Sequence, residues 1–185
     1  MTKLWKSVSV LWAVGMALGV SSLALGATGT GPYYATPSWD QQLPASTRFV
    51  VLSNWGTGNE AVLDRETGLV WEKVPRANNN DVDWHIASTL CAASVTGGRG
   101  GWHLPTIQEL MSLVDPSQSN PALPSGNPFT TVQSSFYLSA TSVDGSTTSA
   151  RGVNLFLGTL GQVPKNYTVG VFHWCVRGGS GVDPQ

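Results

Sequence analysis

The sequence has few charged residues and no excess of basic ones. Only 11% of its 185 residues are charged, less than half of the roughly 25% that is usual for soluble domains. Lysine and arginine number 10 against 11 acidic residues, so the chain lacks the basic face with which nucleic-acid-binding proteins contact phosphates. The scarcity of Glu, Lys and Arg beside 21 glycines excludes a coiled coil, and 41% apolar residues exclude disorder driven by charge.

Cysteine is equally scarce. The two cysteines, Cys91 and Cys175, lie 84 positions apart. In an oxidising compartment they would form one disulfide, and two unrelated buried thiols are the alternative. Neither a C-x-x-C pair nor G-x-S-x-G, H-E-x-x-H or a P-loop is present. The sequence therefore predicts no catalytic residue, no cofactor and no enzymatic function.

The first 27 residues are predicted to be a cleaved signal peptide. Two lysines precede an apolar run over residues 8–25, and small residues follow up to Ala27. An uncleaved anchor is the alternative, because the run is about long enough to span a bilayer. Cleavage leaves eight basic against 11 acidic residues, a net charge of −3. We expect export to the periplasm, cell surface or medium, with no membrane span remaining.

The exported chain is expected to consist of three parts. Residues 28–47 are rich in Gly, Pro and Tyr and are predicted to form an extended arm, through which copies of the chain would self-associate. Residues 48–180 are predicted to form one domain, which is large enough for a real hydrophobic core. Residues 181–185 are a short tail.

Apolar and β-branched runs predict strands on both sides of a central helical region. They are expected over residues 48–54, 61–64 and 69–74, and again over 136–141, 150–157 and 168–176. The connection 65–68 ends in glycine and predicts a hairpin between the strands that it joins. Residues 158–166 are expected to be a turn-rich connection.

Two helices are expected between these groups of strands. The first covers about residues 84–95, with Asp83 as its N-cap. Ile86 and Leu90 share its apolar face, and Ala87 and Cys91 lie next to that face. The second begins at Thr106, because Thr106 and Glu109 have the spacing of a capping box. Strands and helices that are segregated along the chain indicate an α+β fold.

Five motifs resemble, in order, the signature of one family. Gly101–Asp115 (GWHLPTIQELMSLVD) resembles G-W-R-L-P-T-x-x-E-L, and Leu63–Lys73 (LDRETGLVWEK) resembles D-x-x-T-G-L-x-W. The other three are the spacing W-x(6)-C of Trp84 and Cys91, the strand Phe136–Ser142 (FYLSATS) and the ending Cys175–Gly179 (CVRGG). On these residues the chain, from about residue 48 to 180, resembles the Lcl C-terminal domain family.

The resemblance implies a C-type-lectin-like fold, related to the formylglycine-generating-enzyme-like group, with two helices packed on a twisted, mostly antiparallel sheet with long loops. It also implies that Cys91 and Cys175 join the first helix to the last strand. It gives structural roles to the motif residues Trp71, Trp84, Trp102, Leu104, Pro105, Thr106, Glu109 and Arg177. Family members are exported surface or envelope modules, and the adhesin that names the family binds sulfated glycans.

Two departures from the family pattern change the expected ligand. His103 stands where the family has Arg, and Leu138 stands where Trp is common, so a fixed positive charge and an aromatic platform are missing. Together with the net charge of −3 after cleavage, they argue against a polyanion. We expect a non-catalytic recognition module for a neutral glycan or a protein, and the alternative is an assembly subunit of a surface appendage or envelope complex.

Aromatic residues in loop-like segments are the candidate ligand contacts, because an exposed ring can stack on a sugar or anchor a partner protein. They are Trp39, Trp55 and Tyr167, together with Asp144 in the loop DGSTTS. No metal site is predicted. The three histidines are scattered, and Asp81 and Asp83, which resemble a calcium-binding pair, are explained by helix capping.

Overall fold

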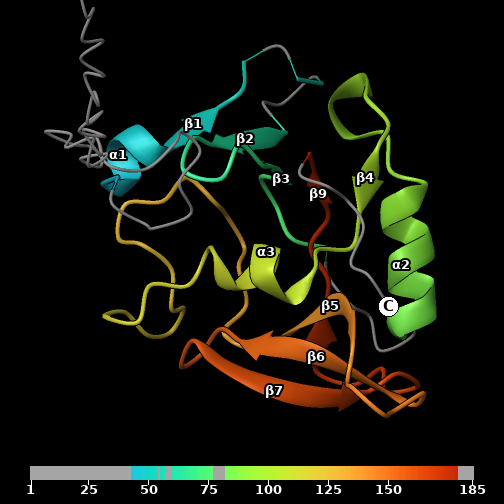
Figure 1. Ribbon diagram of the computed structural model, residues 1–185. Helices are drawn as coiled ribbons and strands as arrows, with labels where there is room; N and C mark the ends of the chain where they lie inside the picture. Colours follow the sequence, from blue (N-terminus) through green and yellow to red (C-terminus); the bar gives the residue numbers. More distant parts are fainter. Residues whose placement is uncertain (1–42, 54, 57–59, 77–81, 179–185) are drawn as a thin grey trace, which may run out of the picture. The chain divides into compact units, whose positions relative to one another are not determined.

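Two β-sheets and three α-helices make up the part of the chain that the structure describes (Figure 1). This computed structural model describes residues 43–53, 55–56, 60–76 and 82–178, all within the unit Tyr34–Gln185. The predicted signal peptide, residues 28–42 of the predicted arm, the tail and Trp39 lie outside the described residues. Among the described helices, none is long and apolar enough to cross a membrane.

The first sheet has five antiparallel strands in the order β1-β2-β3-β9-β4. They are β1 (Phe49–Val51), β2 (Ala61–Asp64), β3 (Val70–Glu72), β4 (Trp102–His103) and β9 (Val176–Arg177). β2 and β3 form the predicted hairpin, with Val62 opposite Trp71. Gly68 has a φ of 72°, a left-handed conformation that favours glycine at the end of this turn. The hairpin prediction is therefore confirmed.

The second sheet has four strands in the order β7-β6-β5-β8. They are β5 (Phe136–Ser142), β6 (Ser149–Asn154), β7 (Thr159–Pro164) and β8 (Val171–Phe172). β8 runs parallel to β5, and the other pairs are antiparallel. The α+β class is confirmed. The predicted strand 168–176 is divided into β8 and β9, which lie in different sheets.

The prediction that residues 158–166 form a connection was also wrong, because most of them form β7. Gly161 and Pro164 weaken the strand pattern of this segment. Gly161 nevertheless fits the sheet closely, since a Cβ atom added there would lie 2.5 Å from the ring of Phe136. The strand is held by its antiparallel pairing with β6, and the close contact of Gly161 with a ring from β5 is not revealed by the sequence of the strand itself.

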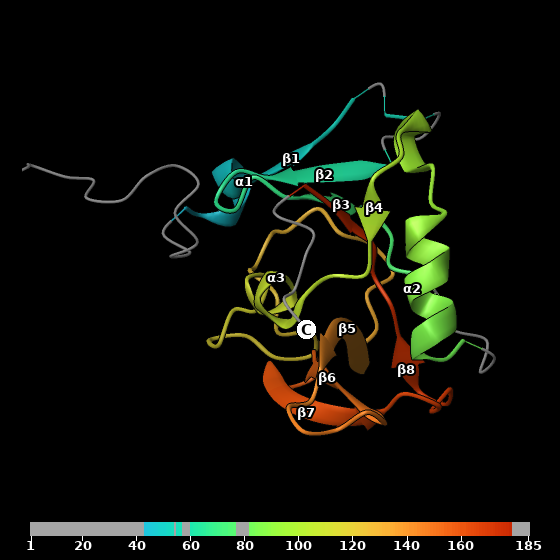
Figure 2. The ribbon, with the colours of Figure 1, turned by 45° about the vertical axis from the view of Figure 1, so that its right-hand side comes forward.

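The helices begin where capping predicts. In α2 (Trp84–Ala92) the carboxylate of Asp83 accepts the N–H of Ile86 at 2.9 Å. In α3 (Ile107–Met111) the capping box of Thr106 and Glu109 is complete. α1 (Ala45–Arg48) occupies the end of the predicted arm and was not expected. Both views place α3 between the two sheets and α2 at their side (Figures 1 and 2).

The buried face of α2 differs from the predicted one. Ile86 and Leu90 are 44% and 37% exposed, whereas Ala87 and Cys91 are fully buried. Cys91 forms a disulfide with Cys175, with the two Cα atoms 5.3 Å apart. The bridge joins α2 to the segment between β8 and β9, and the small side chain of Ala87 lets the helix approach closely. The predicted disulfide is confirmed, and it sets the face that the helix buries.

Two clusters of buried side chains form the core. The larger one surrounds Trp71, Tyr137 and Trp174 and receives Leu110 and Leu113 from the region of α3. The smaller one surrounds the disulfide and contains Trp102, Leu104 and Leu138. Within the larger cluster, Trp71 and Trp174 meet edge to face with 5.5 Å between their ring centres, a favourable geometry for aromatic pairs.

Candidate functional site

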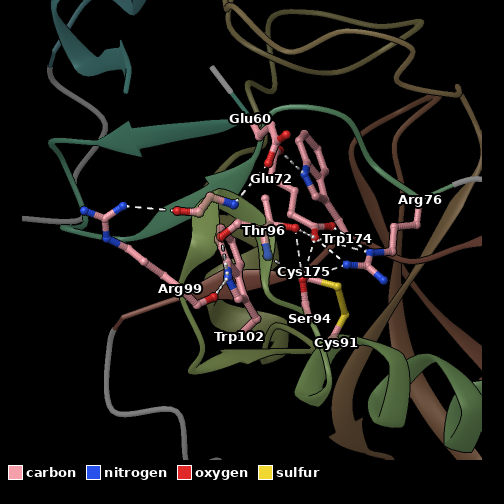
Figure 3. Close-up of polar contacts among 11 residues, drawn as sticks. Glu60, Glu72, Arg76, Cys91, Ser94, Thr96, Arg99, Trp102, Trp174 and Cys175 are labelled. Carbon is pink, nitrogen blue, oxygen red and sulfur yellow. Dashed lines mark hydrogen bonds and ion pairs between the residues drawn. A yellow bond between two sulfur atoms is a disulfide. The ribbon is translucent and has the colours of Figure 1, made fainter. Parts of the chain in front are cut away.

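A buried carboxylate, Glu72, organises a polar network at the end of β3 (Figure 3). Arg76 binds it with two nitrogens, Nη2 at 2.7 Å from Oε1 and Nε at 3.0 Å from Oε2. The hydroxyls of Thr96 and Ser94 donate to Oε1 at 2.7 and 3.1 Å. Glu72 is only 4% exposed, so these charge-assisted bonds compensate the loss of water around its charge.

The backbone around Glu72 is tied to the disulfide segment. The N–H of Glu72 donates to the carbonyl of Cys175 at 3.1 Å, and the indole N–H of Trp174 donates to the carbonyl of Glu72 at 2.6 Å. Figure 3 shows Glu72 close to the Cys91–Cys175 bridge. The position of this carboxylate therefore depends on contacts with residues about a hundred positions away.

A cavity of about 350 Å³ opens beside this network. We call it the Glu72 cavity, and it is lined by Glu60, Glu72, Lys73, Val74, Arg76, Thr96 and Thr130. The carboxylate of Glu60 is held by the N–H of Gly97 at 3.1 Å, and the N–H of Thr130 donates to the carbonyl of Lys73 at 3.1 Å. Two carboxylates, two cations and two hydroxyls thus line one cavity whose formal charge is zero.

His173 is a buried base next to this site. It is 1% exposed, and both of its ring nitrogens lack a hydrogen-bond partner among the described residues. Burial, together with the positive charge of Arg76, lowers the pKa of His173 to about 4, although the negative charge of Glu72 acts in the opposite direction. His173 is therefore neutral in the folded protein near neutral pH.

The neutral burial of His173 predicts a loss of stability in acid. As the pH falls from about 7 to about 4, the unfolded chain binds a proton at this position before the folded chain does. The pKa drops from 6.5 to about 4 on folding, so the loss reaches about 3 kcal/mol at about 1.4 kcal/mol per pH unit. A His173→Leu variant should lack this component and keep nearly the same stability at about pH 7, since no hydrogen bond is lost.

Urea unfolding of both proteins at several pH values measures the difference. Glu109 also loses stabilisation in acid, but it does so in both proteins. The difference in unfolding free energy between the wild-type protein and the variant at each pH therefore reports on His173. An equal slope of stability against pH in the two proteins would contradict the prediction.

His103 and Glu109 form a second polar pair. The Nε2 atom of His103 lies 3.3 Å from Oε2 of Glu109, and the same oxygen accepts the N–H of Thr106 at 2.8 Å. Burial alone would raise the pKa of Glu109, but the hydrogen bonds from His103 and Thr106 and the charge of His103 outweigh burial and lower it. His103 therefore partners the capping carboxylate from the position where the family has arginine.

Trp55 is packed and does not form a free aromatic platform. Its ring lies edge-on to Trp102, with 6.4 Å between the ring centres, and the guanidinium of Arg99 lies 4.1 Å from the centre of the Trp55 ring. The indole N–H of Trp102 in turn donates to the carbonyl of Arg99 at 2.7 Å. The structure therefore shows Trp55 covered by a cation on one side and by a core tryptophan on its edge.

Tyr167 lies in a different place from the Glu72 cavity. It is 47% exposed and lines a groove of about 500 Å³ with Phe136, Gln162, Val163, Pro164, Val169, Gly170 and Val171. Asp144 is exposed in the turn between β5 and β6 and does not line this groove. Among the predicted ligand contacts that the structure describes, Trp55, Tyr167 and Asp144 are therefore not brought together in one site.

The motif residues occupy structural positions. Trp71, Trp102, Leu104, Pro105 and Glu109 are buried. The indole N–H of Trp84 donates to the carbonyl of Ser139 at 2.8 Å. Arg177 forms no ion pair within the described residues, and its Nε donates to the carbonyl of Gly100 at 2.7 Å. It thus joins β9 to the glycine-rich segment before β4.

Sequence reasoning missed the Glu72 network. Glu72 and Lys73 lie within the motif LDRETGLVWEK, but the motif was interpreted only as a hairpin. A glutamate next to a buried tryptophan inside a short strand was the available signal, because charged residues are rarely buried without a partner. Nothing local connects Glu72 with Ser94 and Thr96, more than twenty positions later.

Comparison with known proteins identifies the family. A model of the Lcl C-terminal domain matches residues 60–177, more than half of the 185 residues. A search among curated proteins finds no relative of significant similarity. The matched range includes the whole lining of the Glu72 cavity and both cysteines of the disulfide. The chain therefore belongs to the Lcl C-terminal domain family.

Proposed function

We propose that this chain is an exported, non-catalytic recognition module that binds a neutral glycan in the Glu72 cavity. The observation that carries the proposal is the balanced lining of the cavity, which contains the carboxylates of Glu60 and Glu72 and the cations of Lys73 and Arg76. Sugar hydroxyls donate to carboxylates and accept from ammonium and guanidinium groups. Such a lining offers both donors and acceptors to sugar hydroxyls without requiring charge on the ligand.

The charge of the protein favours a neutral ligand over a sulfated one. A polyanion is attracted by an excess of positive potential. Neither the cavity, with a formal charge of zero, nor the chain, with a net charge of −1 that becomes −3 after the expected cleavage, provides one. The volume of about 350 Å³ falls at the lower end of the range for small-ligand pockets. It therefore suits a short stretch of sugar better than a large protein surface.

Preorganisation supports binding at this cavity. Glu72 is fixed by Arg76, Thr96 and Ser94, so little side-chain freedom is lost there when a ligand binds. Val74 is 49% exposed at the same lining and offers an apolar contact for the C–H groups of a sugar ring. The site thus combines fixed polar groups with an accessible apolar one.

Substitutions at the rim of the cavity should weaken glycan binding without unfolding the domain. We expect Lys73→Ala to lower affinity about tenfold or more, because it removes a charged hydrogen-bond donor. Thr130→Val keeps the shape and removes a hydroxyl, and we expect a smaller loss. Arg65→Ala is the matched control, since it removes an exposed cation outside the cavity lining and should leave affinity unchanged.

A glycan array that holds neutral and sulfated glycans, followed by calorimetry on the best neutral ligand, measures these effects. Retention of neutral glycans and sensitivity to Lys73→Ala would support the proposal. Binding of sulfated glycans only, binding of a protein but of no glycan, or equal affinities for the Lys73→Ala and Arg65→Ala variants would overturn it.

A further inference from the structure

The strand β7 leaves one edge of the four-stranded sheet open. It pairs with β6 on one side, and no described strand lies on its other side (Figure 1). In an antiparallel pair, residues alternate between those that bond to the partner strand and those that point away. Just beyond the two strands, the N–H of Lys165 donates to the carbonyl of Thr148, which directly precedes β6, at 2.8 Å. This bond shows which residues of β7 direct their backbone groups toward β6.

Counting back from Lys165, the backbone groups of Gly161 and Val163 point toward β6. Those of Leu160 and Gln162 point outward, as does the carbonyl of Pro164. The open edge therefore offers two N–H donors and three carbonyl acceptors, and it ends at a proline that has no N–H.

The side chains of β7 do not protect this edge. Its sequence TLGQVP carries no charge, and Leu160 is 57% exposed. Natural edge strands are usually blunted by lysine, by bulges or by proline within the strand, and here proline stands only at the end. The cation that follows, Lys165, lies over the ring of Trp84 and donates to the hydroxyl of Ser142, so it does not repel an approaching strand.

We propose that β7 pairs antiparallel with β7 of a second copy of this chain, with a two-fold axis at Gln162. In this register the N–H of each Gln162 donates to the carbonyl of Gln162 in the second copy. The N–H of each Leu160 donates to the carbonyl of Pro164 in the second copy. Every outward N–H of the strand then has an acceptor. Pro164 has no N–H, so it adds no donor that would need a partner.

The side chains are also compatible with this pairing. Leu160, Gln162 and Pro164 share one face of the strand, because side chains alternate along it. Leu160 would pack against Pro164 of the second copy and lose its exposure, while the two Gln162 amides would meet across the axis. Since β7 carries no charge, the contact of the strand with its own copy brings no like charges together.

Substitution at Gln162 separates this pairing from the stability of the monomer. Gln162→Pro removes an outward N–H and leaves the bonds to β6 intact, and proline is tolerated where an edge N–H faces solvent. Gln162→Thr keeps the N–H and is the matched control. Leu160→Lys is a second variant that places a charge on the edge. Thermal unfolding checks that each variant remains folded.

Sedimentation equilibrium of the full chain over about 1–500 μM, and exchange of backbone amides followed by NMR, test the proposal. We expect a dimer whose dissociation constant rises at least tenfold in Gln162→Pro and Leu160→Lys and changes less than twofold in Gln162→Thr. The amides of Leu160 and Gln162 should become protected as concentration rises. A monomer at every concentration, or a dimer that persists in both edge variants but is lost when residues 28–42 are removed, would overturn the proposal.

Discussion

Replacing both Cys91 and Cys175 with alanine is expected to lower the free energy of unfolding by about 4–5 kcal/mol. The bridge closes a loop with a sequence separation of 84, and in the chain-entropy model a loop of that length restricts the unfolded chain by this amount. Domains of this size have a stability of only about 5–15 kcal/mol. The variant should therefore be close to unfolding at moderate temperature, as urea titration would show.

The dependence on urea tells whether the effect arises in the unfolded state. Without the bridge the unfolded chain exposes more surface, so the slope of the unfolding free energy against urea concentration should increase. The wild-type protein with a reductant should behave like the double variant, and the reductant should not change the double variant. A reduced wild-type protein that is as stable as the oxidised one would contradict the prediction.

The same substitution should affect the Glu72 cavity. The carbonyl of Cys175 accepts the N–H of Glu72 at 3.1 Å, so the bridge that holds Cys175 also holds the strand that carries the buried carboxylate. If the double variant remains folded at low temperature, a weaker affinity for the neutral glycan is expected. The stability of the fold and the geometry of the candidate site thus depend on one covalent link.

Features that depend on neighbouring residues could be predicted from the sequence. The capping box of Thr106 and Glu109 and the turn that ends in Gly68 each involve residues within four positions, and both are present. The disulfide could be predicted because only two cysteines exist. In these cases the chemistry of a short segment, or simple counting, leaves few alternatives.

Features that depend on distant partners could not be predicted. β7 pairs with β6 and lies close to the ring of Phe136 at Gly161, whereas its own residues show only a weak strand pattern. Trp55 lies in a segment typical of exposed loops, but Arg99 and Trp102 cover it. The face of α2 was misjudged because periodicity shows that a helix has an apolar stripe, whereas the disulfide decided which stripe is buried.

A buried ion pair, absent from the sequence-based prediction, joins α1 to β2. Arg48 and Asp64 have side chains that are 2% and 0% exposed. Two nitrogens of Arg48 bind the two carboxylate oxygens at 2.9 and 2.7 Å, and Nη2 also donates to the carbonyl of Ser112 at 2.7 Å. Asp64 accepts in addition the N–H of Glu66 at 3.0 Å. Both carboxylate oxygens of Asp64, and the Nε and Nη2 atoms of Arg48, therefore have hydrogen-bond partners within the protein.

Arg48→Met is expected to lower the free energy of unfolding by about 3–5 kcal/mol, because it leaves the carboxylate of Asp64 buried without its cation. The double variant Arg48→Met, Asp64→Asn should be more stable than this single variant, since no buried charge remains and the asparagine oxygen can still accept the N–H of Glu66. Arg65→Met is the control at an exposed position and should change stability by less than about 0.5 kcal/mol. Urea unfolding of the three variants gives the order, and a double variant less stable than Arg48→Met would show that the unpaired charge is not the cause.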